Sequence, residues 1–156
     1  MSRSGFTLIE LLVTLAIIAT LAMLAAPVAQ TAAQRAREAE LRHALRDIRT
    51  ALDAYKKASD EGRIRKANGE SGYPKTLEQL VEGVEDSKDP KKNKIYFLRK
   101  LPRDPMSENN TASDAATWGK RSYASEPDNP QEGDDVFDVY SLSTSKGLNN
   151  LPYRKW

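Results

Sequence analysis

Residues 4–29, the stretch that decides the fold, read SGFTLIELLVTLAIIATLAMLAAPVA. From Phe6 to Ala29 this stretch is apolar or uncharged except for a single acid, Glu10. A helix over residues 6–29 would be about 36 Å long, and the hydrocarbon core of a bilayer is ~30 Å thick. The sequence therefore predicts one membrane-spanning helix over residues 6–29, followed by a polar domain over residues 30–156.

The composition of the chain limits the classes of function that fit it. The chain has 156 residues, 39% hydrophobic and 29% charged, with a net charge of +2. This near-balance lacks the strongly basic character typical of nucleic-acid-binding domains, so we do not expect nucleic acid as a partner. There is no cysteine, which excludes disulfides and thiolate chemistry, and a single histidine cannot form a histidine metal cluster. Since no phosphate-binding glycine loop or metalloprotease motif is present either, we expect no enzyme activity.

A secretory signal peptide is the main alternative for the N-terminus. Arg3 supplies a basic residue, and the small residues Ala25 and Ala26 could form a cleavage site. The apolar run is long for a signal peptide, and a helical pattern continues after it without a break. A plain signal anchor also remains open, but it gives no reason for Glu10, which would cost roughly 2.5–3.5 kcal/mol in hydrocarbon.

Gly5-Phe-Thr-Leu-Ile-Glu10, directly before an apolar helix, resembles the N-terminus of type IV prepilins and pseudopilins. The resemblance implies that residues 1–5 are a leader and that prepilin peptidase cleaves between Gly5 and Phe6. It also implies methylation of the new Phe6 amine. Pro27 falls where many members of the family have a helix-loosening proline. We therefore expect assembly to depend on Phe6, Glu10 and Pro27.

Glu10 has a physical reason to lie in the membrane if cleavage frees the Phe6 amine. The cationic amine of one subunit can pair with Glu10 of a neighbour, so each buried charge gains an opposite partner. Glu10 would then set the register of assembly. The alternative is a shallow glutamate whose carboxylate reaches the lipid headgroups.

The helix is expected to continue beyond the membrane to about Lys57, with a kink or local melting near residues 23–27 caused by Pro27. An apolar stripe at helical spacing predicts an amphipathic second half. The stripe is Leu41, Leu45, Ile48, Leu52 and Tyr55, with Ala44 and Ala51 beside it. The opposite face is expected to be charged and solvated, and it carries Arg35, Arg37, Glu38, Arg42, Arg46, Arg49, Asp53 and Lys56.

The rest of the chain predicts a short helix and a small sheet. Thr76 and Gln79 have capping-box spacing, which predicts a helix over about residues 76–84. Residues 120–125 and 135–143 are rich in strand-forming side chains. The expected fold is α+β and pilin-like: a long N-terminal helix packed on a small antiparallel sheet.

Four segments in order, GYPKTLEQLVEGV, YFLRKLPRDP, WGKRSY and DVFDVYSLS, resemble the G-type major pseudopilin of type II secretion. This chain departs from that family in a polar insertion, residues 106–117, which we expect to be an exposed loop. It also departs in the C-terminal stretch STSKGLNNLPYRKW, residues 143–156, which contains no acid.

The G-type resemblance implies a calcium site in the C-terminal loop, but the acid-free stretch argues against one. Calcium takes six to eight oxygen ligands, usually including several carboxylates. The weak candidates are Asp134, Asp135, Asp138 and Ser143, with Thr144 and Asn149 as further oxygens. We therefore expect no cofactor, and a metal-free loop held by packing of Leu148, Tyr153 and Trp156.

These features together imply a structural subunit of a type II secretion pseudopilus that helps to drive protein export across the outer membrane. The implied partners are further copies of the chain, other pseudopilins, prepilin peptidase, and an inner-membrane assembly platform powered by a separate cytoplasmic ATPase. The implied location is the inner membrane, with the C-terminal domain in the periplasm. A type IV pilus or DNA-uptake pilin, or a minor cargo-binding tip pseudopilin, remains an alternative. The basic stretch RIRKANG at residues 63–69 could serve DNA, but three cations in a loop are weak evidence.

Overall fold

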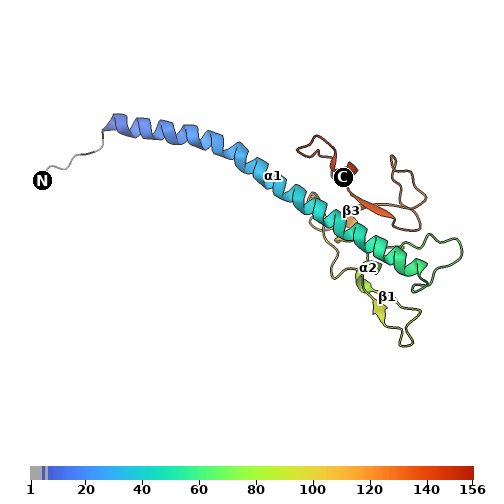
Figure 1. The fold of residues 1–156 in the computed structure, drawn as a ribbon. Helices are drawn as coiled ribbons and strands as arrows, with labels where there is room; N and C mark the ends of the chain where they lie inside the picture. The colour runs from blue at the N-terminus through green and yellow to red at the C-terminus, as the bar shows by residue number, and fades with distance from the viewer. Residues whose placement is uncertain (1–4, 6) are drawn as a thin grey trace. The chain divides into compact units, whose positions relative to one another are not determined.

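The structure is a computed structural model that describes residue 5 and residues 7–156, without the side chains of residues 24–27. The chain divides into two compact units, Met1–Ala36 and Arg37–Trp156. One long helix, α1 (Leu8–Asp60), runs from the first unit into the second (Figure 1). The α+β pilin-like fold is therefore confirmed, with α1 followed by short helices and two small antiparallel sheets.

α1 ends at Asp60 because the chain closes the helix with a Schellman motif. Gly62 adopts a left-handed φ of 74°, and its N–H donates to the Ser59 carbonyl at 2.9 Å. The N–H of Arg63 donates to the Ala58 carbonyl, also at 2.9 Å. These two bonds satisfy carbonyls that the helix end would otherwise leave unpaired, which is why glycine is favoured at this position.

The melting expected around Pro27 is absent, because the helix continues without a break through residues 23–27. A proline removes only one hydrogen bond of the helical ladder, and the neighbouring bonds can keep the backbone helical. The part that Pro27 plays in assembly stays a prediction.

The second unit has a core built on one face of α1. The predicted apolar stripe is confirmed: all seven of its residues are buried, and Leu41 and Ile48 are fully so. Leu77, Trp118 and Val139 from later segments complete the same cluster. In Figure 1 these later segments gather along the C-terminal part of α1.

The predicted helix over 76–84 is shorter in the structure, where α2 spans only Gln79–Glu82. The capping box was wrong: Glu78 is the N-cap without a side-chain cap bond, and the Gln79 side chain accepts from the Lys75 N–H at 2.9 Å. α2 stops early because the N–H groups of Phe97 and Leu98 bond to the Leu80 carbonyl at 3.0 and 2.9 Å. Tertiary contacts thus take over the backbone groups that a longer helix would have used.

Each sheet contains two antiparallel strands. In the first, β1 (Val84–Glu85) pairs with β2 (Lys94–Ile95). In the second, β3 (Trp118–Arg121) pairs with β4 (Asp138–Ser141), with Trp118 opposite Ser141. β3 begins and ends earlier than predicted, and Ser122 starts a turn in which the Ser125 N–H donates to the Ser122 carbonyl. Two 3₁₀ turns, η1 (Ala115–Thr117) and η2 (Tyr153–Lys155), flank this sheet in the sequence.

The insertion at residues 106–117 is only partly the exposed loop that was expected. Residues 108–111 are exposed, but Ala115 and Thr117 are buried. Arg103 holds the loop, since its guanidinium donates to the Ala112 carbonyl at 2.8 Å and to the Asn109 carbonyl. The end of the insertion therefore belongs to the core of the domain.

Candidate functional site

Thr7 and Glu10 form a reciprocal capping box at the start of α1. The Thr7 backbone N–H and hydroxyl donate to Glu10 Oε2 at 2.9 and 3.0 Å, and the Glu10 N–H donates to Thr7 Oγ1 at 3.3 Å. These hydrogen bonds satisfy backbone N–H groups that have no partner inside the helix. The positive end of the helix dipole also stabilises the negative charge of Glu10. The sequence contains the signal, Thr-x-x-Glu before an apolar run, but the sequence interpretation considered only pairing in assembly or contact with the lipid headgroups.

The Glu10 side chain uses one carboxylate oxygen, Oε2, in both of the hydrogen bonds that it accepts from Thr7. The capping box therefore fixes the side chain at the helix start while a second oxygen can accept from another subunit. Phe6, the predicted partner through its amine, lies outside the described residues. The pairing of the two groups stays a prediction.

Gly5, on the leader side of the predicted cleavage point, is exposed. A Cβ added to Gly5 would meet no atom within 4 Å. The described part of the chain would therefore not clash with a side chain at residue 5. The cleavage between Gly5 and Phe6 stays a prediction.

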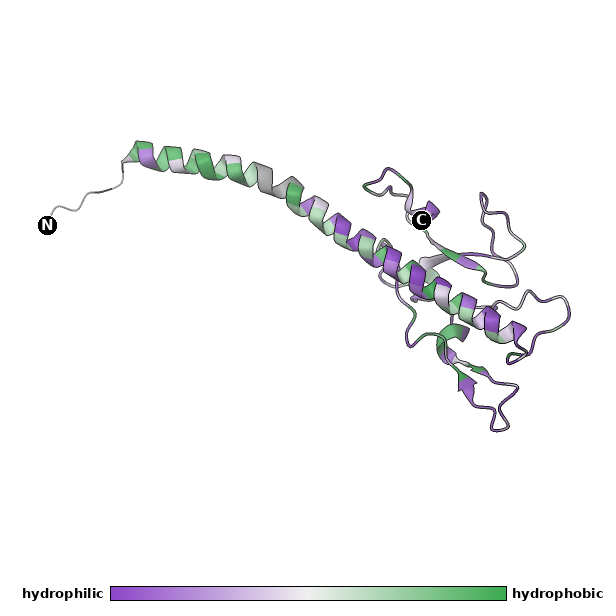
Figure 2. Ribbon diagram, in the orientation of Figure 1, coloured by the Kyte–Doolittle hydropathy of each residue, from purple (hydrophilic) through white to green (hydrophobic). Residues whose placement is uncertain are grey.

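The N-terminal part of α1 exposes nearly all its large apolar side chains within the single chain. Figure 2 shows this part as largely hydrophobic and the later part as mixed. α1 is long and apolar enough to cross a membrane by length and composition. Such exposure in one protein marks a surface that contacts lipid or protein. The exposed residues include Leu8, Leu11, Leu12, Leu15, Ile17, Ile18 and Leu21.

The calcium candidates do not come together in the structure. Asp135 accepts from the Ser71 hydroxyl and from the Tyr123 N–H at 2.8 Å. Asp134, its neighbour, lies in the same loop, where its charge contributes to raising the pKa of Lys75 after the larger effect of Glu70. Ser143 Oγ accepts from the Ser145 N–H at 3.3 Å. Among the described residues no group of three metal-ligating side chains is present.

Asp138 is already paired with two arginines. Its Oδ1 accepts from Arg49 Nε at 2.8 Å, and its Oδ2 lies 3.4 Å from Arg121 Nη2. The Val139 N–H also donates to Oδ1 at 2.8 Å. Because both oxygens are engaged by protein cations, the donor set does not fit a bound calcium ion.

Glu38 and Arg49 are the residues that our sequence interpretation placed wrongly, on a solvated face. Glu38 is 4% exposed, and Arg49 reaches β4 and the C-terminal segment. The spacing could have revealed this, since Glu38 lies three residues before Leu41 in the apolar stripe. Arg49 lies four residues after Leu45, at the edge of the same stripe.

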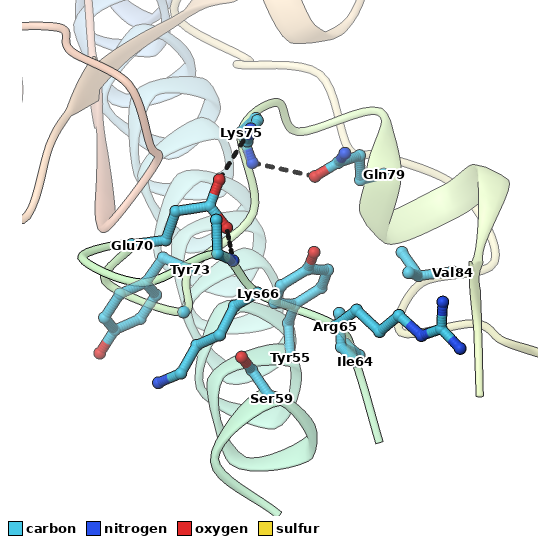
Figure 3. A pocket seen from close by; sticks show the side chains of 12 residues that line it. Tyr55, Ser59, Ile64, Arg65, Lys66, Glu70, Tyr73, Lys75, Gln79 and Val84 are labelled. Atoms are coloured by element: carbon cyan, nitrogen blue, oxygen red, sulfur yellow. Dashed lines mark hydrogen bonds and ion pairs between the residues drawn. The ribbon is translucent and has the colours of Figure 1, made fainter. Parts of the chain in front are cut away.

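A pocket beside the end of α1 has mixed polar and apolar lining (Figure 3). Tyr55, Ser59 and Tyr73 line it, and Glu70 forms an ion pair with Lys75 at 2.9 Å on its rim. The hydrogen bond from Lys75 is the main reason that the pKa of Glu70 lies below its ordinary value. This ion pair closes a turn within the connection between α1 and α2.

The same region contains the basic stretch at residues 63–69. Arg63 is paired with Asp86 at 2.6 Å, and Lys66 lies 3.5 Å from Asp60. Two of the three cations in the stretch are therefore held by acids of this chain, which leaves little positive charge for nucleic acid.

Comparison with known proteins gives two matches. Residues 1–26 match the model of the prokaryotic N-terminal methylation motif, which defines the class of protein as type IV pilin-like. Over 107 residues the chain is 35% identical to the type II secretion system core protein G of Pseudomonas aeruginosa strain PAO1. This region covers 66% of the chain and 68% of that protein. No solved structure matches the chain.

The chain belongs to the family of the type II secretion system core protein G. It is thus a pseudopilin, as the G-type resemblance implied. A secretory signal peptide is not favoured, because the match to the methylation motif spans residues 1–26, which include most of the apolar segment.

Proposed function

We propose that this chain is a structural subunit of a type II secretion pseudopilus and polymerises through the N-terminal part of α1. The observation that carries the proposal is Glu10, held in a capping box at the start of an exposed apolar helix. The match to the methylation motif and to core protein G supports it.

The precursor would lie in the inner membrane through residues 6–29, with residues 30–156 in the periplasm. Prepilin peptidase would remove residues 1–5 and methylate Phe6. Further copies and other pseudopilins would then assemble on an inner-membrane platform whose energy comes from a separate cytoplasmic ATPase. The fibre would help to push substrates through the outer membrane, a mechanical role that requires no catalytic group in this chain.

Assembly would pair the Phe6 amine of an incoming subunit with Glu10 of a neighbour. Both charges leave water on assembly, and their attraction offsets a desolvation cost that neither bears well alone. Since Thr7 already satisfies Oε2, the Glu10 carboxylate enters the interface in a fixed orientation. The capping box would therefore help to position the acid for its partner.

The pairing can be tested with Glu10→Ala in cells that form fibres from the wild-type chain. Breaking a buried ion pair costs about 3–5 kcal/mol, and polymerisation repeats this cost at each subunit. We expect normal membrane levels of processed protein, nearly no fibres by electron microscopy, and nearly no secretion. Glu10→Asp should be intermediate, because the charge remains on a shorter side chain.

Thr14→Ala serves as a matched control in the same helix. Thr14 donates its hydroxyl to the Leu11 carbonyl and lies four residues beyond Glu10. This substitution should leave fibres abundant. Fibres of normal length from Glu10→Ala would overturn the pairing and leave Glu10 as a cap of the helix only.

A further inference from the structure

The C-terminal segment, residues 143–156, is where this chain departs most from the expected calcium-binding pattern. We propose that Glu38 and Arg49 of α1 fasten this segment in place of a metal ion, and that its fold is independent of calcium. This inference concerns the stability of the subunit and goes beyond the proposed assembly function.

Glu38 binds the segment as an anion. Its Oε1 accepts from the Leu148 backbone N–H at 2.8 Å and from the Tyr153 hydroxyl at 3.1 Å. Arg42 Nη2 lies 3.9 Å from the other oxygen. The loop thus turns hydrogen-bond donors toward a carboxylate on the helix. A calcium site requires the opposite polarity, with loop oxygens turned toward a cation.

Arg49 binds oxygens from β4 and from the end of the segment. Its guanidinium donates to Asp138 Oδ1 at 2.8 Å, to the Val139 carbonyl at 3.2 Å and to the Trp156 main-chain oxygen at 2.9 Å. One carboxylate oxygen and two main-chain oxygens are ligands of the kind that calcium prefers. Here a fixed protein cation binds them, with charge-assisted geometry that needs no metal.

The loop between these two anchors closes on itself. The Gly147 N–H donates to the Leu151 carbonyl and the Asn150 N–H to the Gly147 carbonyl, both at 2.9 Å. A Cβ on Gly147 would lie 2.5 Å from the Trp156 ring, so the turn requires glycine. The Arg42 guanidinium lies 4.3 Å from the centre of the same ring. These contacts give the segment a defined conformation without an ion.

The first test is hydrogen exchange of the full chain in detergent micelles, with peptides from residues 143–156 resolved by mass spectrometry. We expect the same exchange rates with excess EDTA and with excess calcium. Isothermal titration of the same sample with calcium should give no stoichiometric binding heat. Faster exchange in EDTA that calcium reverses, or one calcium bound per chain, would overturn the proposal.

The second test removes each anchor. Glu38→Gln should speed exchange of the Leu148 amide about tenfold, since the charged acceptor of its hydrogen bond becomes a neutral amide oxygen, which binds more weakly. Glu40→Gln removes the same charge from an exposed position of α1 and should leave that amide unchanged. Equal exchange in the two variants would overturn the role of Glu38.

Arg49 is tested in the same way, with exposed Arg46 as its control. Arg49→Met should speed exchange of the last residues about tenfold or more, whereas Arg46→Met should not. Peptides around Ile48, in the buried face of α1, report whether each variant remains folded. A folded Arg49→Met chain whose C-terminal exchange equals that of Arg46→Met would overturn the role of Arg49.

Discussion

Thr7 and Glu10 together cap the start of α1, and Glu10 is proposed to have a second function. Within one chain they close the first turn of α1, and between chains Glu10 is proposed to bind the Phe6 amine. These functions are compatible because the Glu10 side chain uses a single carboxylate oxygen in the hydrogen bonds that it accepts from Thr7. A short motif can therefore define both a helix start and an assembly contact.

Thr7→Val should open this first turn without changing side-chain shape. Loss of a threonine cap costs about 1 kcal/mol, which corresponds to roughly fivefold faster exchange of the Glu10 amide. Thr7→Ser keeps the hydroxyl and should exchange as the wild type does. Amide exchange by NMR of the full chain in micelles measures both variants, and equal rates for valine and serine would contradict the capping role.

Gly5→Val should leave an uncut precursor in the membrane. The structure places nothing near Gly5 that a side chain would hit, so the change should act at the peptidase, where a side chain at residue 5 would prevent close approach of the backbone. Mass spectrometry of the membrane fraction measures the N-terminus. Ser2→Val, also in the leader, should be processed normally, and a mature chain beginning at Phe6 from Gly5→Val would refute the expectation.

At the scale of elements, α1 has two parts with different surroundings. The first part exposes its apolar side chains, and the second buries an apolar stripe in the core of Arg37–Trp156. The stripe follows helical spacing, so it could be predicted from the sequence. The early end of α2 could not be predicted from the sequence, because it depends on hydrogen bonds from the N–H groups of Phe97 and Leu98.

The two parts of α1 should differ in how much they contribute to the free energy of unfolding, which Ile48→Ala and Ile17→Ala test. Ile48 is fully buried, and its truncation should lower the free energy of unfolding by about 2–5 kcal/mol, whereas Ile48→Val should cost about 0.5–1.5 kcal/mol. Ile17 is 53% exposed, so Ile17→Ala should leave this free energy unchanged. Urea unfolding in micelles, followed by tryptophan fluorescence, measures all three, and an equal loss in both alanine variants would contradict the division.

At the scale of the whole molecule, ion pairs link segments of the second unit and make its stability depend on pH. Hydrogen bonds from Arg63 lower the Asp86 pKa, and those from Lys75 lower the Glu70 pKa. Such acids stabilise the fold above their unfolded pKa, and the contribution is lost as pH falls through the folded pKa. The pKa of Lys75 is raised by Glu70, so its contribution is lost only as pH rises through that raised value.

We therefore expect the free energy of unfolding to be nearly constant from about pH 5 to 9 and to fall below about pH 4, near the unfolded pKa of aspartate. Asp86→Asn should be less stable than wild type at pH 7, and the difference should shrink toward pH 3. Asp128→Asn, at an exposed position, should show no such difference. Urea unfolding across this range measures the effect, and a constant Asp86→Asn difference down to pH 3 would argue against the ion pair.

The sequence by itself determined the features that lie in one continuous stretch. The apolar run, the processing motif and the stripe of α1 depend on residues within a few turns of one another, so spacing and composition reveal them. The same reasoning missed the early end of α2 and the exact limits of β3 and β4, because these depend on which distant backbone groups are available to bond.

Only the tertiary structure decided how the C-terminal segment is held. Glu38 contacts Leu148, 110 residues away, and Arg49 contacts Trp156, 107 residues away. In the sequence both look like members of a solvated charged face. Their roles depend on which oxygen and nitrogen atoms the fold brings within hydrogen-bond distance. Glu38 is buried, and a buried charge requires a partner.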